Sequence, residues 1–278
     1  MNRQNLFTLF ATFALLFCFT YSCNAKGKDK AKHVVFIGLD GWGAYSLPKA
    51  DMPNVKKLME DGAYTLKKRS ALPSSSAINW ASMFMGTGPE LHGYTEWGSK
   101  TPELPSRVLN KNGIFPTVFQ LLRDARPEAE IGCLYEWEGI KYVVDTLSLN
   151  YHYHVADCNK TPKELGNMAS AYIKEKHPAL VAICYDGPDH TGHTEGHDTP
   201  AYYEKLKELD IYVGQIVQAV KDAGILDDTI FILTSDHGGI DKGHGGKTMQ
   251  EMETAFIISG KNIKKGLRFD DVSMMQYD

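Results

Sequence analysis

Short apolar runs alternate along the chain with longer segments in which apolar residues recur every three or four positions. The short runs predict buried strands at residues 33–39, 131–135, 179–185, 229–234 and 255–259. The periodic segments predict helices at residues 53–61, 77–85, 119–123, 162–175 and 200–223. Because strands and helices alternate, the pattern predicts an α/β fold, a three-layer α/β/α sandwich with a mostly parallel central sheet.

The first 25 residues differ from the rest of the chain. Arg3 is their only charged residue, residues 6–21 are largely apolar, and the segment ends in Cys23, Asn24 and Ala25. This pattern predicts a signal peptide, and hence a periplasmic or secreted protein. Cleavage after Ala25 and lipid attachment at Cys23 are the two alternatives, and the second would make the protein a membrane-anchored lipoprotein. A permanent membrane helix fits less well, because the apolar run is short and lysines follow it directly.

The remaining residues, 26–278, suit a single large domain. The whole chain has 278 residues, of which 43% are hydrophobic, and its formal net charge is −4. This composition allows a sizeable core, and the charge gives no basic surface for a nucleic-acid polymer. Cys133, Cys158 and Cys184 lie beyond the signal segment, and an odd number of cysteines does not make a disulfide framework.

Carboxylates and imidazoles follow three of the predicted strands. The six side chains are Asp40, Asp189, His193, Asp236, His237 and His244. Ligand sites in open α/β sheets lie outside the carboxyl ends of the strands, and Asp and neutral His are preferred ligands of zinc and similar divalent metals. Six ligands are enough for two metals, which together can clamp the attacking and leaving oxygens of a displacement at phosphorus. Unrelated surface features are the alternative, which the repetition at strand ends disfavours.

Three adjacent serines precede the predicted helix at 77–85: Ser74, Ser75 and Ser76. Backbone N–H groups at the start of a helix favour anions, and a metal can lower the pKa of a serine hydroxyl enough to make it a nucleophile. The residues alone do not distinguish among the three serines.

Taken together, these motifs resemble the alkaline phosphatase superfamily, in particular its nucleotide pyrophosphatase/phosphodiesterase branch. The matching blocks occur in family order as GLDG (38–41), MPNVKKLMEDGAYT (52–65), LPSSSAINWASMFMGTGPELHG (72–93), PDHTGH (188–193), TSDHGG (234–239), GHGG (243–246) and METAFIISG (252–260). The resemblance implies two Zn²⁺ or other divalent ions. One would be held by Asp40, Asp236 and His237 and would activate Ser76, and the other by Asp189, His193 and His244.

The resemblance implies an exported, two-metal phosphoric ester hydrolase that acts on small phosphate esters through a covalent phosphoserine intermediate. Cleavage of diesters or pyrophosphates is the first expectation, and a phosphomonoesterase of the same fold is the alternative. A sulfatase is a further alternative, although residues 74–79 lack the Cys/Ser-x-Pro-x-Arg segment that sulfatases need. A catalytically silent metal-binding surface protein is the interpretation from a different functional class.

Three departures from the family pattern concern the substrate and the stability of the fold. Trp97 falls near the place of a phosphate-binding Asn, only residues 238–243 separate His237 from His244, and the chain stops where family members continue, so that a truncated copy is one interpretation. We expect residues 98–160 to form a small cap over the metals, although packing and surface roles are the alternative for its aromatic residues. The substrate candidates are Asn79, Trp97, Tyr151 and Tyr153.

Overall fold

An eight-stranded sheet forms the centre of the part of the chain that the computed structural model describes, residues 29–156 and 162–278. Its strands are β1 (His33–Leu39), β2 (Gly62–Arg69), β3 (Ile131–Tyr135), β4 (Tyr151–His154), β5 (Leu180–Tyr185), β6 (Thr229–Thr234), β7 (Glu253–Gly260) and β8 (Leu267–Arg268). They lie in the order β4-β3-β5-β1-β6-β7-β2-β8. Among these strands β7 alone runs antiparallel to its neighbours, so the predicted mostly parallel sheet is confirmed.

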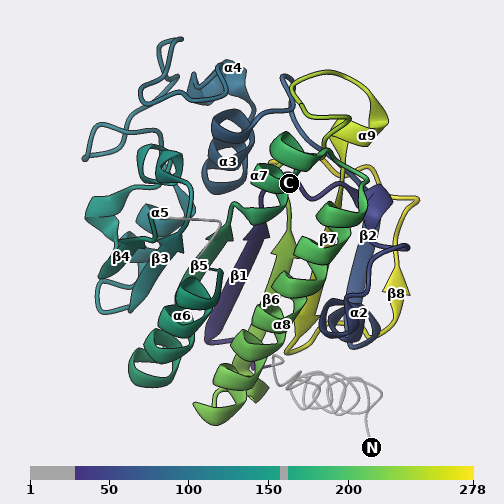
Figure 1. The fold of residues 1–278 in the computed structure, drawn as a ribbon. Helices are drawn as coiled ribbons and strands as arrows, with labels where there is room; N and C mark the ends of the chain where they lie inside the picture. The colour runs from purple at the N-terminus through teal and green to yellow at the C-terminus, as the bar shows by residue number, and fades with distance from the viewer. Residues whose placement is uncertain (1–28, 157–161) are drawn as a thin grey trace, which may run out of the picture. The chain divides into compact units, whose positions relative to one another are not determined.

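Helices cover both faces of this sheet (Figure 1). Within the described residues the α-helices are α2 (Pro53–Glu60), α3 (Ser76–Met85), α4 (Pro89–His92), α5 (Val118–Ala125), α6 (Pro162–Lys176), α7 (Gly187–Glu195), α8 (Pro200–Asp222) and α9 (Met249–Met252). Short 3₁₀ turns lie at Ala44–Ser46, Glu138–Tyr142, Thr146–Ser148 and Leu226–Asp228. Helices α2, α6 and α8 pack on one face, and α3 and α5 pack on the other. The three-layer sandwich is therefore confirmed.

Alternation along the strands divides the apolar residues between two cores. In β1, Val35 and Ile37 belong to the core beneath α2, α6 and α8, whereas Phe36 packs against the core beneath α3 and α5. Successive side chains of a strand point to opposite faces of a sheet, so an unbroken apolar run is what a strand covered on both sides requires. This explains why the runs at β1, β5 and β6 were recognisable from the sequence.

Residues 151–154, which were expected in a cap formed by residues 98–160, lie in the central sheet. Tyr151–His154 form β4, which pairs in parallel with β3 at the edge of the central sheet. The alternating Tyr-His pattern is typical of a half-buried strand, and the ring of Tyr151 stacks on Tyr172 of α6 with the centroids 5.0 Å apart. Tyr151 and Tyr153 therefore extend the sheet layer instead of rising over the metal ligands.

Several other expectations concern the ends of the chain and the cysteines. The predicted signal peptide with Cys23, and also Cys158, lie outside the described residues. Within the described residues, no helix combines the length and the apolar character that a membrane crossing needs. Cys133 and Cys184 are buried free thiols, as their position in apolar strands predicts.

Candidate metal centre and nucleophile

The candidate site lies at the carboxyl ends of three neighbouring strands, β5, β1 and β6. Figure 1 shows their arrowheads pointing to the edge of the sheet where α7 and α3 lie. Asp40 follows β1 and Asp236 follows β6, and the amide of Gly41 donates a hydrogen bond of 3.1 Å to Asp236 Oδ1. Neighbouring strands are about 4.8 Å apart, so side chains that leave their ends converge although they are distant in the sequence.

The first group of ligands comprises Asp40, Asp236 and His237, all of them buried. The Nε2 atom of His237 lies 3.4 Å from Asp40 Oδ1 and 3.3 Å from Asp236 Oδ2. Its Nδ1 atom faces the carbonyl of Gly238 at 2.8 Å. Because a carbonyl oxygen only accepts, Nδ1–H is the donor and Nε2 presents its lone pair to the two carboxylates. The indole of Trp80 donates to Asp40 Oδ2 at 2.8 Å and so fixes that carboxylate.

The second group comprises Asp189, His193 and His244. The first two occupy successive turns of α7, a helix that the apolar pattern did not predict, and Asp189 Oδ2 lies 3.1 Å from His193 Nε2. The loop after β6 brings His244 Nε2 to 3.8 Å from Asp189 Oδ1. The six predicted ligands are therefore brought together, and their roles stay a prediction.

The arrangement of these groups fits divalent metal ions. Two sets of ligand atoms, Asp189–His193–His244 and Asp40–Asp189–His237, each lie within 4.8 Å of one another. Asp189 Oδ1 and Asp236 Oδ2 are buried and have no hydrogen-bond partner. A buried carboxylate oxygen without a partner costs free energy, and a cation between these atoms would remove that cost.

Electrostatics point the same way. Burial, followed by the charge of Asp236, raises the pKa of Asp40 well above its usual value. Burial and the charge of Asp189 raise the pKa of Asp236 to about 7. Burial and the neighbouring His237 lower the pKa of His244 to about 4, which keeps its imidazole neutral at neutral pH. Neutral imidazole is the metal-binding form, and the two carboxylates lack the positive charge that a bound metal supplies.

Among the three serines, Ser76 is the one that contacts the first group. Its Oγ lies 3.1 Å from His237 Nε2 and 3.5 Å from Asp40 Oδ1, at the first residue of α3. Ser74 Oγ instead donates to the carbonyl of Gly246 at 2.7 Å. Ser75 Oγ lies 3.5 Å from His244 Nδ1. The geometry therefore separates three serines that the residues alone did not.

The structure corrects the expectation that Asn79 contacts the substrate. Its Oδ1 accepts from the amide of Ala71 at 2.7 Å. Its Nδ2 donates to the carbonyls of Ala71, Pro73 and Ser75 at 3.2, 3.2 and 3.0 Å. The side chain is fully buried and its polar atoms are all used by the backbone. Asn79 thus shapes the loop that carries the serines.

Trp97 lies beside the start of α3. Its carbonyl accepts from the amide of Ala77 at 3.1 Å, so one of the N–H groups in the first turn of that helix is already occupied. Its side chain is 68% exposed. The exposed ring leaves a contact between Trp97 and substrate as a prediction.

No pattern of residues predicted that Lys68 lies near the site. Its side chain is 2% exposed, and Nζ donates to the carbonyl of Ser235 and to Gln276 Oε1, each at 2.7 Å. Burial lowers the pKa of this amine to about 7, against the opposing charge of Asp236. Lysine at a fully buried position is rare. The burial of Lys68 can be recognised only once the strand pairing of β2 is known.

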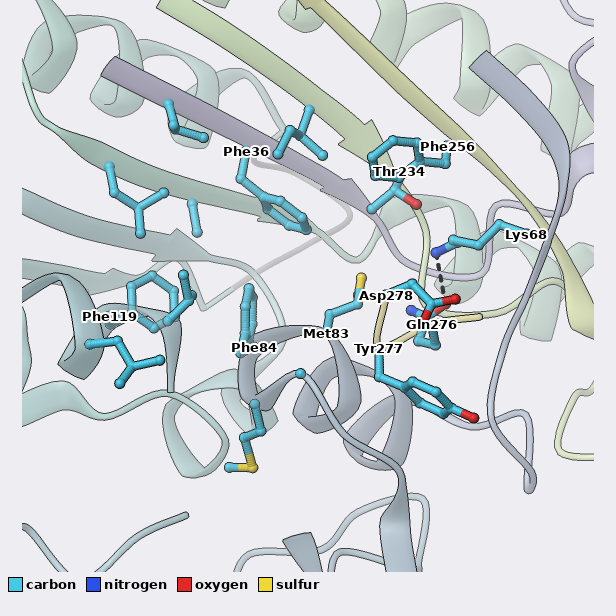
Figure 2. Close-up of a pocket in the computed structure, with 18 of the residues that line it drawn as sticks. Phe36, Lys68, Met83, Phe84, Phe119, Thr234, Phe256, Gln276, Tyr277 and Asp278 are labelled. Carbon is cyan, nitrogen blue, oxygen red and sulfur yellow. Dashed lines mark hydrogen bonds between the residues drawn. The ribbon is translucent and has the colours of Figure 1, made fainter. Parts of the chain in front are cut away.

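Lys68 also borders a cavity of about 420 Å³ on the face of the sheet that carries α3 and α5 (Figure 2). Figure 2 shows Phe36, Phe84 and Phe119 along this cavity, with the bond from Lys68 to Gln276 at one side. None of the six predicted ligands lines it. Although it is roomy, we therefore do not assign the chemistry to this cavity.

The comparison with known families agrees with the geometry. Residues 34–256 match the model of the type I phosphodiesterase / nucleotide pyrophosphatase family. The chain belongs to this family. A family member from Mus musculus, bis(5'-adenosyl)-triphosphatase enpp4, is 26% identical over 221 residues, which cover 76% of this chain and 48% of that protein. The chain thus spans about half the length of this relative. GPI ethanolamine phosphate transferase 3 from Schizosaccharomyces pombe is 29% identical over 122 residues, 43% of this chain and 13% of that protein.

Solved structures show the same fold. Murine ectonucleotide pyrophosphatase / phosphodiesterase 5, as an inactive variant in complex with AMP, superposes with a TM-score of 0.71 at 15% identity and covers 90% of this chain and 92% of that chain. A 2-O GAG sulfatase superposes with a TM-score of 0.70 at 13% identity and covers 89% of this chain and 68% of that chain. Both phosphodiesterases and sulfatases thus use this architecture, so the fold does not select between them.

Proposed function

We propose that this phosphodiesterase-family chain hydrolyses phosphodiesters or pyrophosphates with Ser76 as its nucleophile and two divalent metal ions as cofactors. One observation carries the proposal: Ser76 Oγ lies 3.1 Å from His237 Nε2 and 3.5 Å from Asp40 Oδ1, within a set of ligand atoms. A nucleophile must lie within reach of the groups that activate it. Ser76 alone among the three serines meets this condition on the first group of ligands.

Each of the two groups of ligands would hold one metal ion. Asp40, Asp236 and His237 would hold one Zn²⁺, and Asp189, His193 and His244 would hold the other. Bound metals lower the pKa of a hydroxyl and offset the charge of a phosphoryl group. The coordination positions that these side chains leave open on each metal would bind the substrate and the nucleophile, as in other catalytic zinc sites.

The residues of the chain supply orientation and a covalent intermediate. Ser76 Oγ gives up its proton to solvent, attacks phosphorus and forms an O–P bond, while the bond to the leaving alcohol or phosphate breaks and the leaving oxygen takes up a proton from water. Water then cleaves that O–P bond, which releases the phosphate product and restores the hydroxyl. The start of α3 favours the transferred phosphoryl group, because helix N-termini attract anions. Ser75, the N-cap, makes no side-chain capping bond there.

The substrate class follows from the family and the charge of the chain. The relatives include a bis(5'-adenosyl)-triphosphatase, and a neighbouring solved structure holds AMP. We therefore propose a small nucleotide-like phosphate ester in preference to a nucleic-acid polymer, which the net charge of −4 also disfavours. The leader at residues 1–25 leads us to propose that the enzyme works in the periplasm or outside the cell. Lipid attachment at Cys23 would tie it to a membrane.

Metal content and substrate preference test this proposal together. We expect about two metals per chain, and a higher kcat/KM for bis-p-nitrophenyl phosphate than for p-nitrophenyl phosphate. Preference for the monoester would make the protein a phosphomonoesterase, and turnover of p-nitrophenyl sulfate would make it a sulfatase. Full metal content without turnover of any ester would identify a silent metal-binding protein.

A further inference from the structure

The three predicted histidine ligands share one hydrogen-bond arrangement. Their Nδ1 atoms each face a backbone carbonyl, at 2.8 Å in His237, 2.9 Å in His193 and 3.1 Å in His244. A carbonyl cannot donate, so Nδ1 carries the hydrogen and Nε2 is left with a lone pair. Metal-binding histidines usually fix their tautomer in this way.

His197, in the loop between α7 and α8, repeats this arrangement. Its Nδ1 faces the carbonyl of Asp241 at 3.3 Å, which leaves the lone pair on Nε2. That nitrogen is buried and has no hydrogen-bond partner. It lies 3.7 Å from Asp189 Oδ1, another buried atom without a hydrogen-bond partner. Two buried acceptors that face each other are unfavourable unless a cation or a proton lies between them.

The distance matches those of the predicted ligands. Nε2-to-carboxylate distances are 3.1 Å for His193, 3.4 Å for His237 with Asp40, and 3.8 Å for His244. The 3.7 Å of His197 falls within this range. Asp189 thus presents Oδ2 to His193 and Oδ1 to His197 and His244.

A second buried histidine, His92, shows the contrasting case. Its Nδ1 accepts from the amide of Tyr94 at 3.0 Å, so the hydrogen lies on Nε2 and faces Ser82 Oγ at 3.1 Å. Both ring nitrogens of His92 are therefore used by the protein itself. A packing role explains His92, but it does not explain the free Nε2 of His197.

The surrounding residues hold the ring of His197 in place. A Cβ atom added to Gly192 or Gly239 would come within 2.3 or 2.2 Å of the imidazole, so glycine is required at both positions for the ring to fit. On another side the ring packs on Tyr202 of α8, with the centroids 5.5 Å apart. Helix α7, helix α8 and the loop after β6 all contribute to this position.

We propose that His197 is an additional metal ligand, which binds through Nε2 the cation held by Asp189. The inference rests on the proposed metal centre, and it adds one imidazole to the six ligands that the sequence predicts. His197 belongs neither to the motif used for the resemblance nor to the two sets of ligand atoms described above. It is identified by its tautomer, its burial and its unpartnered nitrogen.

A crystal structure of the zinc-loaded protein, with zinc located by anomalous scattering, tests this directly. We expect His197 Nε2 at about 2.0–2.1 Å from a zinc ion, the usual Zn–N distance. The proposal is overturned if zinc is bound and Nε2 lies more than about 3 Å from every ion, well beyond that bonding distance. If no zinc binds to the folded protein, the metal centre of the proposed function is wrong as well.

Two variants and a control test it in solution. In a chelator competition, His197→Ala and His197→Gln should each weaken the binding of one metal by at least about 10-fold. Mutating a residue that only hydrogen-bonds to a metal ligand already lowers metal affinity by about tenfold to hundredfold, and loss of a ligand should cost no less. The control His92→Ala, which removes a buried histidine away from the ligands, should keep both affinities. Glutamine can still donate a hydrogen bond to Asp189. Wild-type affinity in His197→Gln would therefore show a hydrogen-bonding role and contradict ligation.

Discussion

Ser74, Ser75 and Ser76 enter α3 together, yet each has different neighbours in the folded protein. We predict that Ser76→Ala lowers turnover by about 10³-fold or more, because loss of a nucleophile leaves only binding and electrostatics. Metal content should stay the same, since the proposed ligands other than Ser76 would still hold the ions. Steady-state kinetics with elemental analysis measures both.

The matched control is Ser75→Ala, one residue away on the same loop. This variant should keep most of its turnover. Ser75 Oγ does not contact the first group of ligands, and it lies 3.5 Å from His244 Nδ1, at the limit of a hydrogen bond. If Ser75→Ala is inactive and Ser76→Ala is active, the nucleophile is Ser75 and the assignment to Ser76 is wrong.

Asn79 supports the serine loop with four hydrogen bonds to the backbone. We predict that Asn79→Ala lowers the free energy of unfolding by about 2–4 kcal/mol, because buried donors and acceptors lose their partners. Turnover should fall as well, because the loop loses its support. Chemical denaturation measures the first effect, with Ser82→Ala on the same helix as a milder control. An increase in KM alone, at unchanged stability, would restore Asn79 as a substrate contact.

At the scale of single residues, the sequence identifies the site residues that belong to a recognisable motif. Asp40, Asp236 and His237 follow predicted strands, so their convergence could be foreseen. Lys68 could not be foreseen, because it lies on a strand whose lysines read as a polar segment. The role of Trp80 as a donor to Asp40 depends on the packing of α3 against β1, which is a tertiary contact.

Among the elements, α7 depends on a buried acid at its start. Glu136, which follows β3, is 4% exposed, and its Oε2 accepts from the amide of Asp186 at 2.8 Å. Burial raises the pKa of Glu136 to about 8 from 4.5. The folded protein therefore binds this proton more tightly than the unfolded chain. The contribution to stability is fully present below pH 4.5 and is lost as the pH rises through about 8.

We predict that Glu136→Gln removes this pH dependence, because glutamine keeps the acceptor and cannot ionise. Between pH 5 and 8 the metal-free wild type should lose on the order of 1–4 kcal/mol relative to the variant, since one pKa unit corresponds to about 1.4 kcal/mol. Urea unfolding at a series of pH values measures the difference. Parallel curves for the two proteins would contradict it. Glu138→Gln is the exposed control and should change little.

Elements with a strong apolar period could be predicted, and those without one could not. The bounds of β1, β6 and α8 follow from apolar runs and helical spacing. Helix α7 is rich in Gly, Thr and His and has no apolar stripe, so its helical form depends on packing against α8. Strand β4 has only an alternating Tyr-His pattern, which is equally compatible with a surface loop.

For the whole molecule, metal removal should be destabilising. The site gathers three buried carboxylates, and a ligand that binds only the native state stabilises it by about 4 kcal/mol at a thousandfold excess over its Kd. We predict that a strong chelator lowers Tm by several degrees and that added zinc restores it. Thermal unfolding measures this, and Asp236→Ala should respond less. An unchanged Tm in the chelated wild type would contradict the metal centre.

The sandwich architecture follows from the alternation of strands and helices, whereas the strand order does not. Strand β2 pairs with β7, from the far end of the chain, and Gly62 lies opposite Ser259. Local periodicity carries no information about such distant pairing, and it predicted no strand at residues 62–69. The antiparallel direction of β7 likewise depends on a connection through the loop that carries His244.

The two halves of the metal centre differ in how early they can exist during folding. Asp189 and His193 lie one helical turn apart, so a short stretch of chain already presents both. The contact of Asp236 with Gly41 spans 195 residues, and it forms only when β1 and β6 have paired, at the entropic cost of a long loop. We therefore expect zinc added during refolding to meet the local half first and to bind the denatured chain as well. The gain in stability measured with zinc should then be smaller than the native affinity alone implies.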